Sequence, residues 1–577
     1  MAFQESSLTK VGTKGSDVYT AAGVKDPRVA LSVLLTRGSD VQTIQSGIDA
    51  VLALDDRNQA IKDIFVMAFQ TRDVRGGKGE RDVAYEMLKY LLHNKDLDTL
   101  ALDLLDLIPE YGSWRDLFVL ANTEDGARGR VLDLTVQQFE KDRKTEKVSL
   151  MAKHAPREDK YPQLFKELAN RIFADEPKYS RRLRALRKSL AAMNRASKTV
   201  EVAMCAKEFA TIQPQEVPGR ALQKYTKAFL NQPSTFKNAI NPRPSQDSDR
   251  IQCAETFTNH FGKAAKGEAK LNGATTVFPH ELIKKIVINQ ASYKAHDMDT
   301  DEWTFGNLTQ EEKDSVVAVW NGMVAAARGG GGLGRSLAMC DFSGSMQSSG
   351  SNGDTPYWVS MAIGLLISEV TTQEFQDTFL TFDSTPTFHV LPKGDIFERV
   401  SSINPSIAQG TSTDFQKAMD LVLQRCKQLR VKPGEEPENL IVLTDMNWDQ
   451  ACGSNETSIF TGNKYRHVVK TNPWQTHVEM IRESFKRAGE DMWGEGNGLK
   501  MPRIVIWNIA ATSTDFHAQS DTEGVVMLSG WSPSLFKVLQ MEGVKTMTPY
   551  DALRCQLDDE RYDLVRDRVE KWLSVEV

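Results

Sequence analysis

The stretch Ser336-Leu337-Ala338-Met339-Cys340-Asp341-Phe342-Ser343-Gly344-Ser345 decides the fold of the C-terminal part of the chain. Its first five residues form a short apolar run that is typical of a buried strand. Asp341, Ser343 and Ser345 then follow at alternate positions on the loop that leaves this strand. Alternate residues of an extended loop can converge on one point, and their oxygens are ligands that Mg²⁺, Mn²⁺ or Ca²⁺ prefer. The other interpretation is a Ser/Gly turn whose Asp341 caps the next helix.

Strand and helix patterns alternate after this loop. Helices are predicted over 356–374 and 414–429, and strands over 379–382, 387–391, 440–445, 503–509 and 524–528. This alternation predicts a parallel sheet with helices on both faces. Asp341 and Asp445 each end a predicted strand, and ligands of such sheets bind at the carboxyl ends of strands. The two carboxylates are therefore expected to meet.

These residues make the region resemble the von Willebrand factor A domain, a Rossmann-like α/β fold with a metal-ion-dependent adhesion site (MIDAS). That family combines an Asp-x-Ser-x-Ser loop with a Thr before a helix and an Asp at the end of a later strand. Asp445, in Leu443-Thr444-Asp445, matches the late carboxylate. Gly410-Thr411-Ser412-Thr413-Asp414 offers two threonines, and we prefer Thr413 because it directly precedes Asp414.

The resemblance implies a divalent cation held by Asp341, Ser343, Ser345, Thr413 and Asp445. We expect Mg²⁺ first, with Ca²⁺ and Mn²⁺ as alternatives. In the family, at least one carboxylate usually acts through water. An open position on the metal accepts an acidic residue of a partner protein.

Composition excludes several classes of protein. No run of 18 apolar residues exists, and the start of the chain lacks the basic then apolar pattern of a signal peptide. The six cysteines are scattered without a Cys-x-x-Cys pair, and the histidines form no His-Glu-x-x-His group. We therefore expect a cytoplasmic protein that contacts no membrane and has neither a disulfide scaffold nor a zinc site.

The first part of the chain is predicted to be helical, with almost no strand-like alternation before residue 336. Apolar residues recur at helical spacing over 41–54, 57–71, 80–92, 96–108, 113–122, 161–174, 181–193, 200–210, 217–231 and 279–288. Helix pairs without a fixed repeat predict an all-α, HEAT-like solenoid. The expected domains are a flexible arm (1–25), a helical domain (26–327), a Gly-rich hinge (328–335) and the A-like domain (336–577).

Charge is distributed unevenly along the chain. Residues 336–577 hold 33 acidic and 22 basic side chains, net −11, so the total of −6 leaves +5 on residues 1–335. The segment 178–198 holds eight Lys and Arg and no acid. At helical spacing, Arg181, Arg184, Lys188 and Arg195 form one stripe, opposite Leu183, Leu186, Leu190 and Met193. Such a row suits phosphates, whereas a solvated face paired with acids is the alternative.

Two glycine-rich segments are also candidates for binding or hinge roles. Arg72–Arg81 contains Gly76-Gly77-Lys78-Gly79 but lacks the Ser/Thr and the preceding strand of a Walker A loop. It could bind an anion at a helix start or form a tight interhelical turn. Arg328–Arg335 contains a GxGxxG match that precedes a strand, which indicates a hinge. The candidate RNA-binding residues are Arg181, Arg184, Arg187, Lys188, Arg195, Lys198, Arg75 and Lys78.

Further motifs make the whole chain resemble the TROVE/Ro-like family, and most closely its uncharacterised TROVE-like branch. They are Thr71-Arg72-Asp73, Gly76–Arg81, Tyr111–Leu117, Leu186–Leu190, Val217–Leu222, Tyr225, Ile506-Trp507-Asn508 and Leu528–Ser532. Proteins of this family join a ring of HEAT-like helices to a C-terminal von Willebrand factor A domain. The resemblance implies binding of structured and single-stranded RNA on the basic ring, in ribonucleoproteins of RNA quality control.

Three functions of different classes follow. The first is a non-enzymatic RNA-binding protein whose metal-site domain binds a further partner. The second is a metal-dependent scaffold for protein partners that does not bind RNA. The third is a metal-dependent hydrolase, which we disfavour because no general base other than Asp445 stands near the metal loop. His389 and His467 are nearest in sequence, and nothing ties them to the site.

Overall fold

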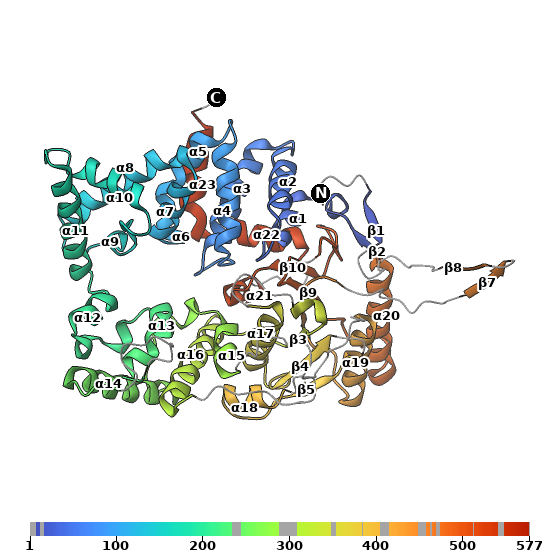
Figure 1. The fold of residues 1–577 in the computed structure, drawn as a ribbon. Helices are drawn as coiled ribbons and strands as arrows, with labels where there is room; N and C mark the ends of the chain where they lie inside the picture. The colour runs from blue at the N-terminus through green and yellow to red at the C-terminus, as the bar shows by residue number, and fades with distance from the viewer. Residues whose placement is uncertain are drawn as a thin grey trace.

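The N-terminal part of the protein is built almost entirely of helices (Figure 1). The computed structural model describes residues 7–11, 17–233, 244–287, 308–347, 354–382, 385–403, 415–447, 457–461, 464–468, 474–511, 513–540 and 547–575. The helices of this part are α1 (Pro27–Leu34), α2 (Val41–Leu52), α3 (Arg57–Arg72), α4 (Arg81–His93), α5 (Asp98–Asp103), α6 (Ile108–Tyr111), α7 (Trp114–Thr123), α8 (Asp125–Asp142), α9 (Met151–His154), α10 (Pro162–Ile172), α11 (Tyr179–Ala196), α12 (Val200–Ala206), α13 (Gly219–Phe229), α14 (Ser248–Ala265), α15 (Pro279–Ile286) and α16 (Gln310–Gly329).

The C-terminal part is an α/β domain around a six-stranded sheet. Its strands are β3 (Ser336–Asp341), β4 (Thr378–Phe382), β5 (Phe388–Val390), β6 (Asn439–Thr444), β9 (Arg503–Asn508) and β10 (Val525–Ser529). They lie in the order β10-β9-β6-β3-β4-β5, and all pairs are parallel except β4 with β5. The helices are α17 (Pro356–Val370), α18 (Ile396–Ser401), α19 (Phe415–Gln428), α20 (Trp474–Trp493), α21 (Phe536–Gln540), α22 (Pro549–Leu557) and α23 (Asp563–Leu573). A separate hairpin joins β7 (Thr457–Thr461) to β8 (Lys464–Val468).

The expected fold class is confirmed, and most predicted elements lie within two residues of the observed ones. The predicted helix over 96–108 is the clearest exception, because it divides into α5, a 3₁₀ turn (Leu104–Leu107) and α6. Ser113 caps α7 as predicted, in a capping box with Asp116. No helix among the described residues is both long and apolar enough to cross a lipid bilayer.

Both ends of the helical arc rest on the α/β domain, so the chain closes into a ring (Figure 1). At its beginning, α1 packs against β10, and at its end α15 and α16 pack against α17. The last helices return to the arc, because α22 and α23 both pack against α3. α22 also packs against β10 and α21, so the end of the chain contacts both the sheet and the helical arc.

Each face of the sheet shares a buried core with one end of the helical arc. Alternate residues of its strands point to opposite faces. Leu337 and Met339 of β3 lie in a buried cluster with α1–α7, α19, α20 and α23. Ala338 and Cys340 lie in a second cluster with α12–α17. The described part of residues 1–25, which we expected to be a flexible arm, forms a small hairpin of β1 (Thr9–Val11) and β2 (Asp17–Tyr19) that bridges to Phe516.

Candidate metal centre and basic helix

The metal loop predicted from sequence leaves the carboxyl end of β3. Asp341 is fully buried there, and its carboxylate accepts hydrogen bonds from the Ser343 amide at 2.9 Å and the Thr444 hydroxyl at 3.0 Å. The hydroxyls of Ser343 and Ser345 lie 3.1 Å apart. The loop therefore gathers one carboxylate and two hydroxyls at one point, as the alternate spacing predicted.

The second carboxylate stands on the neighbouring strand. Asp445 directly follows β6, which pairs with β3, and it is fully buried. Asn447 holds it, donating its backbone amide at 3.1 Å and its side-chain amide at 2.9 Å. Burial, together with the negative charge of Asp445, raises the pKa of Asp341 to about 7. The two carboxylates are therefore close enough to repel each other.

This donor set fits a small divalent cation. The oxygens of two buried carboxylates and of the neighbouring hydroxyls are hard ligands. The negative charges of the two carboxylates repel each other, and a bound cation would remove that repulsion. Asp341, Ser343, Ser345 and Asp445 would hold it, and the cation would supply a coordination position for an incoming oxygen. Thr413, our preferred further ligand, and Thr411 both lie outside the described residues.

Other metal chemistry finds no support among the described residues, which hold no group of three or more His, Cys, Asp and Glu side chains placed to bind a metal. His389 lies on β5, with β4 between it and β3. His467 lies on β8, and its side chain is outside the described residues. Sequence reasoning missed His517, whose Nε2 lies 2.9 Å from the Met446 carbonyl beside the site. Burial lowers the pKa of His517 to about 4, and nothing in its sequence context signals this position.

The basic helix is α11, and its two faces are as predicted. Leucine and methionine side chains are buried in a cluster with α8, α9 and α10: Leu183, Leu186, Leu190 and Met193. Six candidate RNA-binding side chains are exposed on the helix and just beyond it: Arg181, Arg184, Arg187, Lys188, Arg195 and Lys198. We call these six residues the α11 basic face.

Two members of the α11 basic face have acidic neighbours. Arg181 lies 3.7 Å from Glu176, and Arg187 lies 2.9 Å from Glu158. All four side chains of these pairs are partly or largely exposed, so each pair is weak in water. The other four members form no ion pair within the described parts of the chain. Arg184, Lys188, Arg195 and Lys198 are thus available to an outside anion.

The structure contradicts one candidate RNA-binding residue, Lys78, which lies in the loop before α4. Lys78 is only 1% exposed, so it cannot reach RNA in this structure. Its ammonium group donates to the Ser32 carbonyl at 2.5 Å, the Ser529 hydroxyl at 2.8 Å and the Leu35 carbonyl at 3.4 Å. Arg75 is exposed on the same loop, far along the chain from the α11 basic face. The loop is therefore an interhelical turn that anchors the arc to β10.

Comparisons with known proteins cover most of the chain. Residues 335–571 match the model of a domain of unknown function, DUF7788. An uncharacterized protein of Acanthamoeba polyphaga mimivirus is 24% identical over 512 residues, which is 84% of this chain and 77% of that protein. The crystal structure of the Deinococcus radiodurans RO (RSR) protein matches 89% of this chain and 99% of its own, at 14% identity and a TM-score of 0.38.

Proposed function

We propose that this chain is an RNA-binding protein whose α11 basic face contacts the phosphates of RNA. The observation that carries the proposal is the set of exposed cations without an acidic partner in the described structure. From Arg184 to Arg195 the helix rises about 16 Å, at about 1.5 Å per residue. That length spans several phosphates of one strand. One guanidinium group can bind two oxygens of a phosphate at once. A row of such groups therefore favours a nucleic acid over a single acidic side chain.

The helix is also rigid enough to present these charges. Its apolar side is fixed by a core of α8, α9 and α10, so the cations project from a packed scaffold and not from a loop. A fixed row loses less conformational freedom on binding than a flexible tail does. The resemblance of the sequence motifs to the TROVE/Ro-like family supports the same class of ligand.

The metal centre supplies a second proposed interaction, with a protein partner that offers an Asp or Glu to a bound Mg²⁺, or to Ca²⁺ or Mn²⁺. The proposed role is non-enzymatic, because both buried carboxylates, Asp341 and Asp445, would be engaged in holding the cation. We place the function in the cytoplasm. The five cysteines that the structure describes are free thiols, which suits a reducing compartment.

The direct test is RNA affinity of the full chain, measured with a labelled single-stranded RNA and a stem-loop RNA. Reversing two charges, Arg184→Glu with Lys188→Glu, should weaken RNA binding by at least about tenfold. Each phosphate contact releases counterions from the RNA, and that favourable contribution to the affinity is lost with the contact. The matched control is Arg425→Glu with Lys427→Glu, two exposed cations on α19. Equal affinity of the wild type and the α11 variant would reject the α11 basic face as the RNA site.

A scaffold without RNA binding is the second candidate, and the repulsion between Asp341 and Asp445 favours it. It predicts no RNA affinity even at low salt. It also predicts that the Asp445→Asn variant and a chelator both abolish capture of peptides that carry an acidic residue. RNA affinity that survives chelation would instead leave the first proposal standing.

A further inference from the structure

The residue that follows Asp445 has an unusual backbone conformation. Met446 has a φ of 64°, in the left-handed region that residues other than glycine rarely adopt. Its side chain is fully buried in the core cluster that one face of the sheet shares with α1–α7. Such a conformation costs free energy and persists only where the surrounding structure holds it. The contacts of Met446 therefore determine the shape of the turn after β6.

Both polar groups of the Met446 backbone form hydrogen bonds. The amide donates to the Thr444 hydroxyl at 3.1 Å. The carbonyl oxygen lies 2.9 Å from Nε2 of His517, in the connection between β9 and β10. A carbonyl oxygen only accepts hydrogen bonds, so Nε2 carries the proton and donates it. The left-handed turn is thus held on one side by the last residue of β6 and on the other by a histidine.

This turn determines where the two carboxylates of the metal centre lie. The Thr444 hydroxyl, which accepts from Met446, donates to the Asp341 carboxylate at 3.0 Å. After the turn, Asn447 donates its backbone and side-chain amides to the Asp445 carboxylate, at 3.1 and 2.9 Å. Met446 lies between these two sets of hydrogen bonds. A rotation of its backbone would therefore displace Asp445 relative to Asp341.

His517 is itself fixed, because the chain on both sides of it pairs with the N-terminal segment. The histidine is only 2% exposed. Phe516, directly before it, exchanges two backbone hydrogen bonds with Tyr19 of β2, at 2.8 and 3.2 Å. After it, the Ser520 amide donates to the Val24 carbonyl at 2.8 Å. The imidazole ring therefore projects from a held backbone.

The rigidity of a carboxylate ligand affects which cation it prefers. Mg²⁺ requires nearly ideal octahedral geometry with oxygens at about 2.0–2.1 Å, whereas Ca²⁺ accepts flexible arrangements with oxygens at about 2.3–2.6 Å. A site whose carboxylates cannot move apart therefore favours the smaller ion. Residues that orient a ligand without touching the metal commonly change metal affinity by about 10–100-fold.

We propose that His517 is a positioning residue that makes the metal centre selective for Mg²⁺ over Ca²⁺. By donating to the Met446 carbonyl, it maintains the left-handed turn and keeps Asp445 at a fixed place beside Asp341. His517 acts through Met446 and is not itself a metal ligand. This role rests on the metal site of the proposed function, and it adds which ion that site prefers and which side chain determines the preference.

The test is calorimetric titration of the metal-free full chain with Mg²⁺ and, separately, with Ca²⁺. The wild type should bind Mg²⁺ more tightly than Ca²⁺. In His517→Asn the side-chain nitrogen lies near the place of Nδ1, too far back to reach the Met446 carbonyl. The Mg²⁺ affinity of this variant should fall by about tenfold, whereas its Ca²⁺ affinity should change by less than about twofold.

A longer amide restores the hydrogen bond. In His517→Gln the side-chain nitrogen lies near the place of Nε2 and can donate to the same carbonyl, so the preference for Mg²⁺ should return. The two variants differ by one methylene group at the same buried position. A histidine that only supported the fold would weaken the binding of both ions alike, and its glutamine variant would not restore the ratio of the two affinities.

The outcomes separate this role from the metal site itself. If the wild type and His517→Asn have the same ratio of Mg²⁺ to Ca²⁺ affinity, His517 loses the role and the metal site stands. Absence of Mg²⁺ binding by the wild type would reject the metal site and this role together. Tighter binding of Ca²⁺ than of Mg²⁺ by the wild type would overturn the role alone. If His517→Asn does not fold, His517→Phe replaces it, because a phenyl ring fills the position without a donor.

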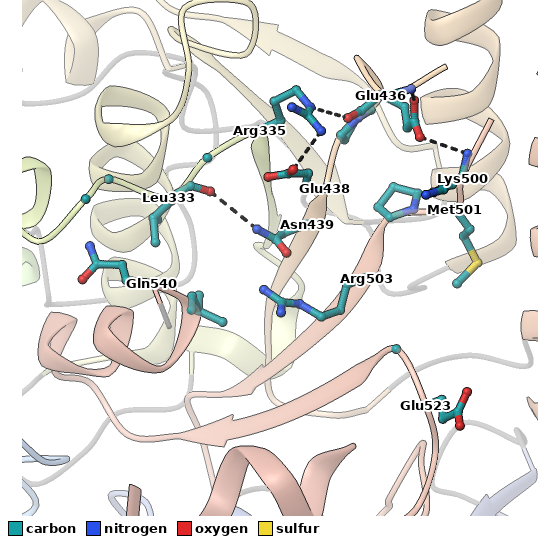
Figure 2. A pocket seen from close by; sticks show the side chains of 18 of the residues that line it. Leu333, Arg335, Glu436, Glu438, Asn439, Lys500, Met501, Arg503, Glu523 and Gln540 are labelled. Atoms are coloured by element: carbon teal, nitrogen blue, oxygen red, sulfur yellow. Dashed lines mark hydrogen bonds and ion pairs between the residues drawn. The ribbon is translucent and has the colours of Figure 1, made fainter. Parts of the chain in front are cut away.

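A cavity at the other ends of β3 and β6 is the competing location for a cation. It has a volume of about 520 Å³, and Glu436, Glu438 and Glu523 line it (Figure 2). Glu438 forms an ion pair with Arg335 at 2.8 Å, and Glu436 accepts hydrogen bonds from two backbone amides. Glu523 is exposed, so Glu523→Gln is the control and should leave both affinities unchanged. Loss of Mg²⁺ binding in this variant would place the cation in the cavity and overturn the proposal.

Discussion

The ammonium group of Lys78 donates a hydrogen bond to the hydroxyl of Ser529 at 2.8 Å, across 451 positions of the sequence. Ser529 ends β10, and its hydroxyl also donates to the Ser32 carbonyl of α1 at 2.6 Å. Gly530, with a φ of 110°, lets the Lys78 side chain pass, because a Cβ there would lie 3.0 Å from the Cβ of Lys78. One buried lysine thus joins the first helices of the arc to the sheet.

This lysine predicts a pH dependence of stability. Burial lowers the pKa of Lys78 to about 7, whereas an unfolded lysine has a pKa of about 10.4. Between these values the unfolded chain holds a proton that the folded chain lacks, so the free energy of unfolding rises with pH. The rise is at most about 1.4 kcal/mol per pH unit. Denaturant unfolding of wild type and Lys78→Met should therefore diverge between pH 7 and 10, and parallel curves would contradict the prediction.

The sequence alone predicted those parts of the fold that local residue patterns determine. The apolar runs of β3, β6 and β9 and the two-faced pattern of α11 are periodic signals, and the structure reproduces them. The spacing of Asp341, Ser343 and Ser345 likewise brought three oxygen-bearing side chains together. Burial of Lys78 could not be read from Gly-Gly-Lys-Gly, because the pattern of an exposed loop is the same. Its partners lie on α1 and β10, and only tertiary packing brings these elements together.

The metal centre predicts a divalent-cation response that depends on Asp341. Mg²⁺ at about 100 times its Kd should stabilise the wild type by about 2.7 kcal/mol, and EDTA should remove the effect. Asp341→Asn should abolish the response. In EDTA, however, this variant should be at least as stable as the wild type, because it removes repulsion with Asp445. Thermal unfolding with and without Mg²⁺ measures both effects, and the exposed Asp55→Asn is the control.

A destabilised Asp341→Asn variant in EDTA would contradict this account. It would mean that the hydrogen bonds from Ser343 and Thr444 outweigh the repulsion between the carboxylates. An Asp55→Asn variant that lost the Mg²⁺ response would show that the cation acts elsewhere on the protein.

Asp73, which directly follows α3, contacts the 3₁₀ turn (Glu560–Tyr562) that leads into α23. This fully buried carboxylate accepts hydrogen bonds from the Arg561 guanidinium group and from the Tyr562 hydroxyl at 3.3 Å. Asp73→Ala should destabilise the protein by about 3 kcal/mol, because it leaves the partly buried Arg561 with only the more distant Glu110, at 3.9 Å, as an ion-pair partner. Asp96→Ala breaks an exposed pair with Arg57 and should cost less than about 1 kcal/mol. Urea unfolding compares the two, and equal losses would show that Asp73 does not fasten α23 to α3.

The salt dependence of RNA binding gives the number of phosphates that the α11 basic face contacts. For single-stranded RNA, each contact contributes about 0.7 to the slope of log K against log salt concentration. Replacing Arg184, Lys188 and Arg195 together by Gln should therefore lower the magnitude of the slope by about 2, as measured by fluorescence anisotropy over a salt series. Replacing Arg425, Lys427 and Arg487 by Gln removes the same charge from the α/β domain and should leave the slope unchanged. Equal reductions in the two triple variants would mean that RNA responds to overall charge, and the α11 basic face would lose its assignment.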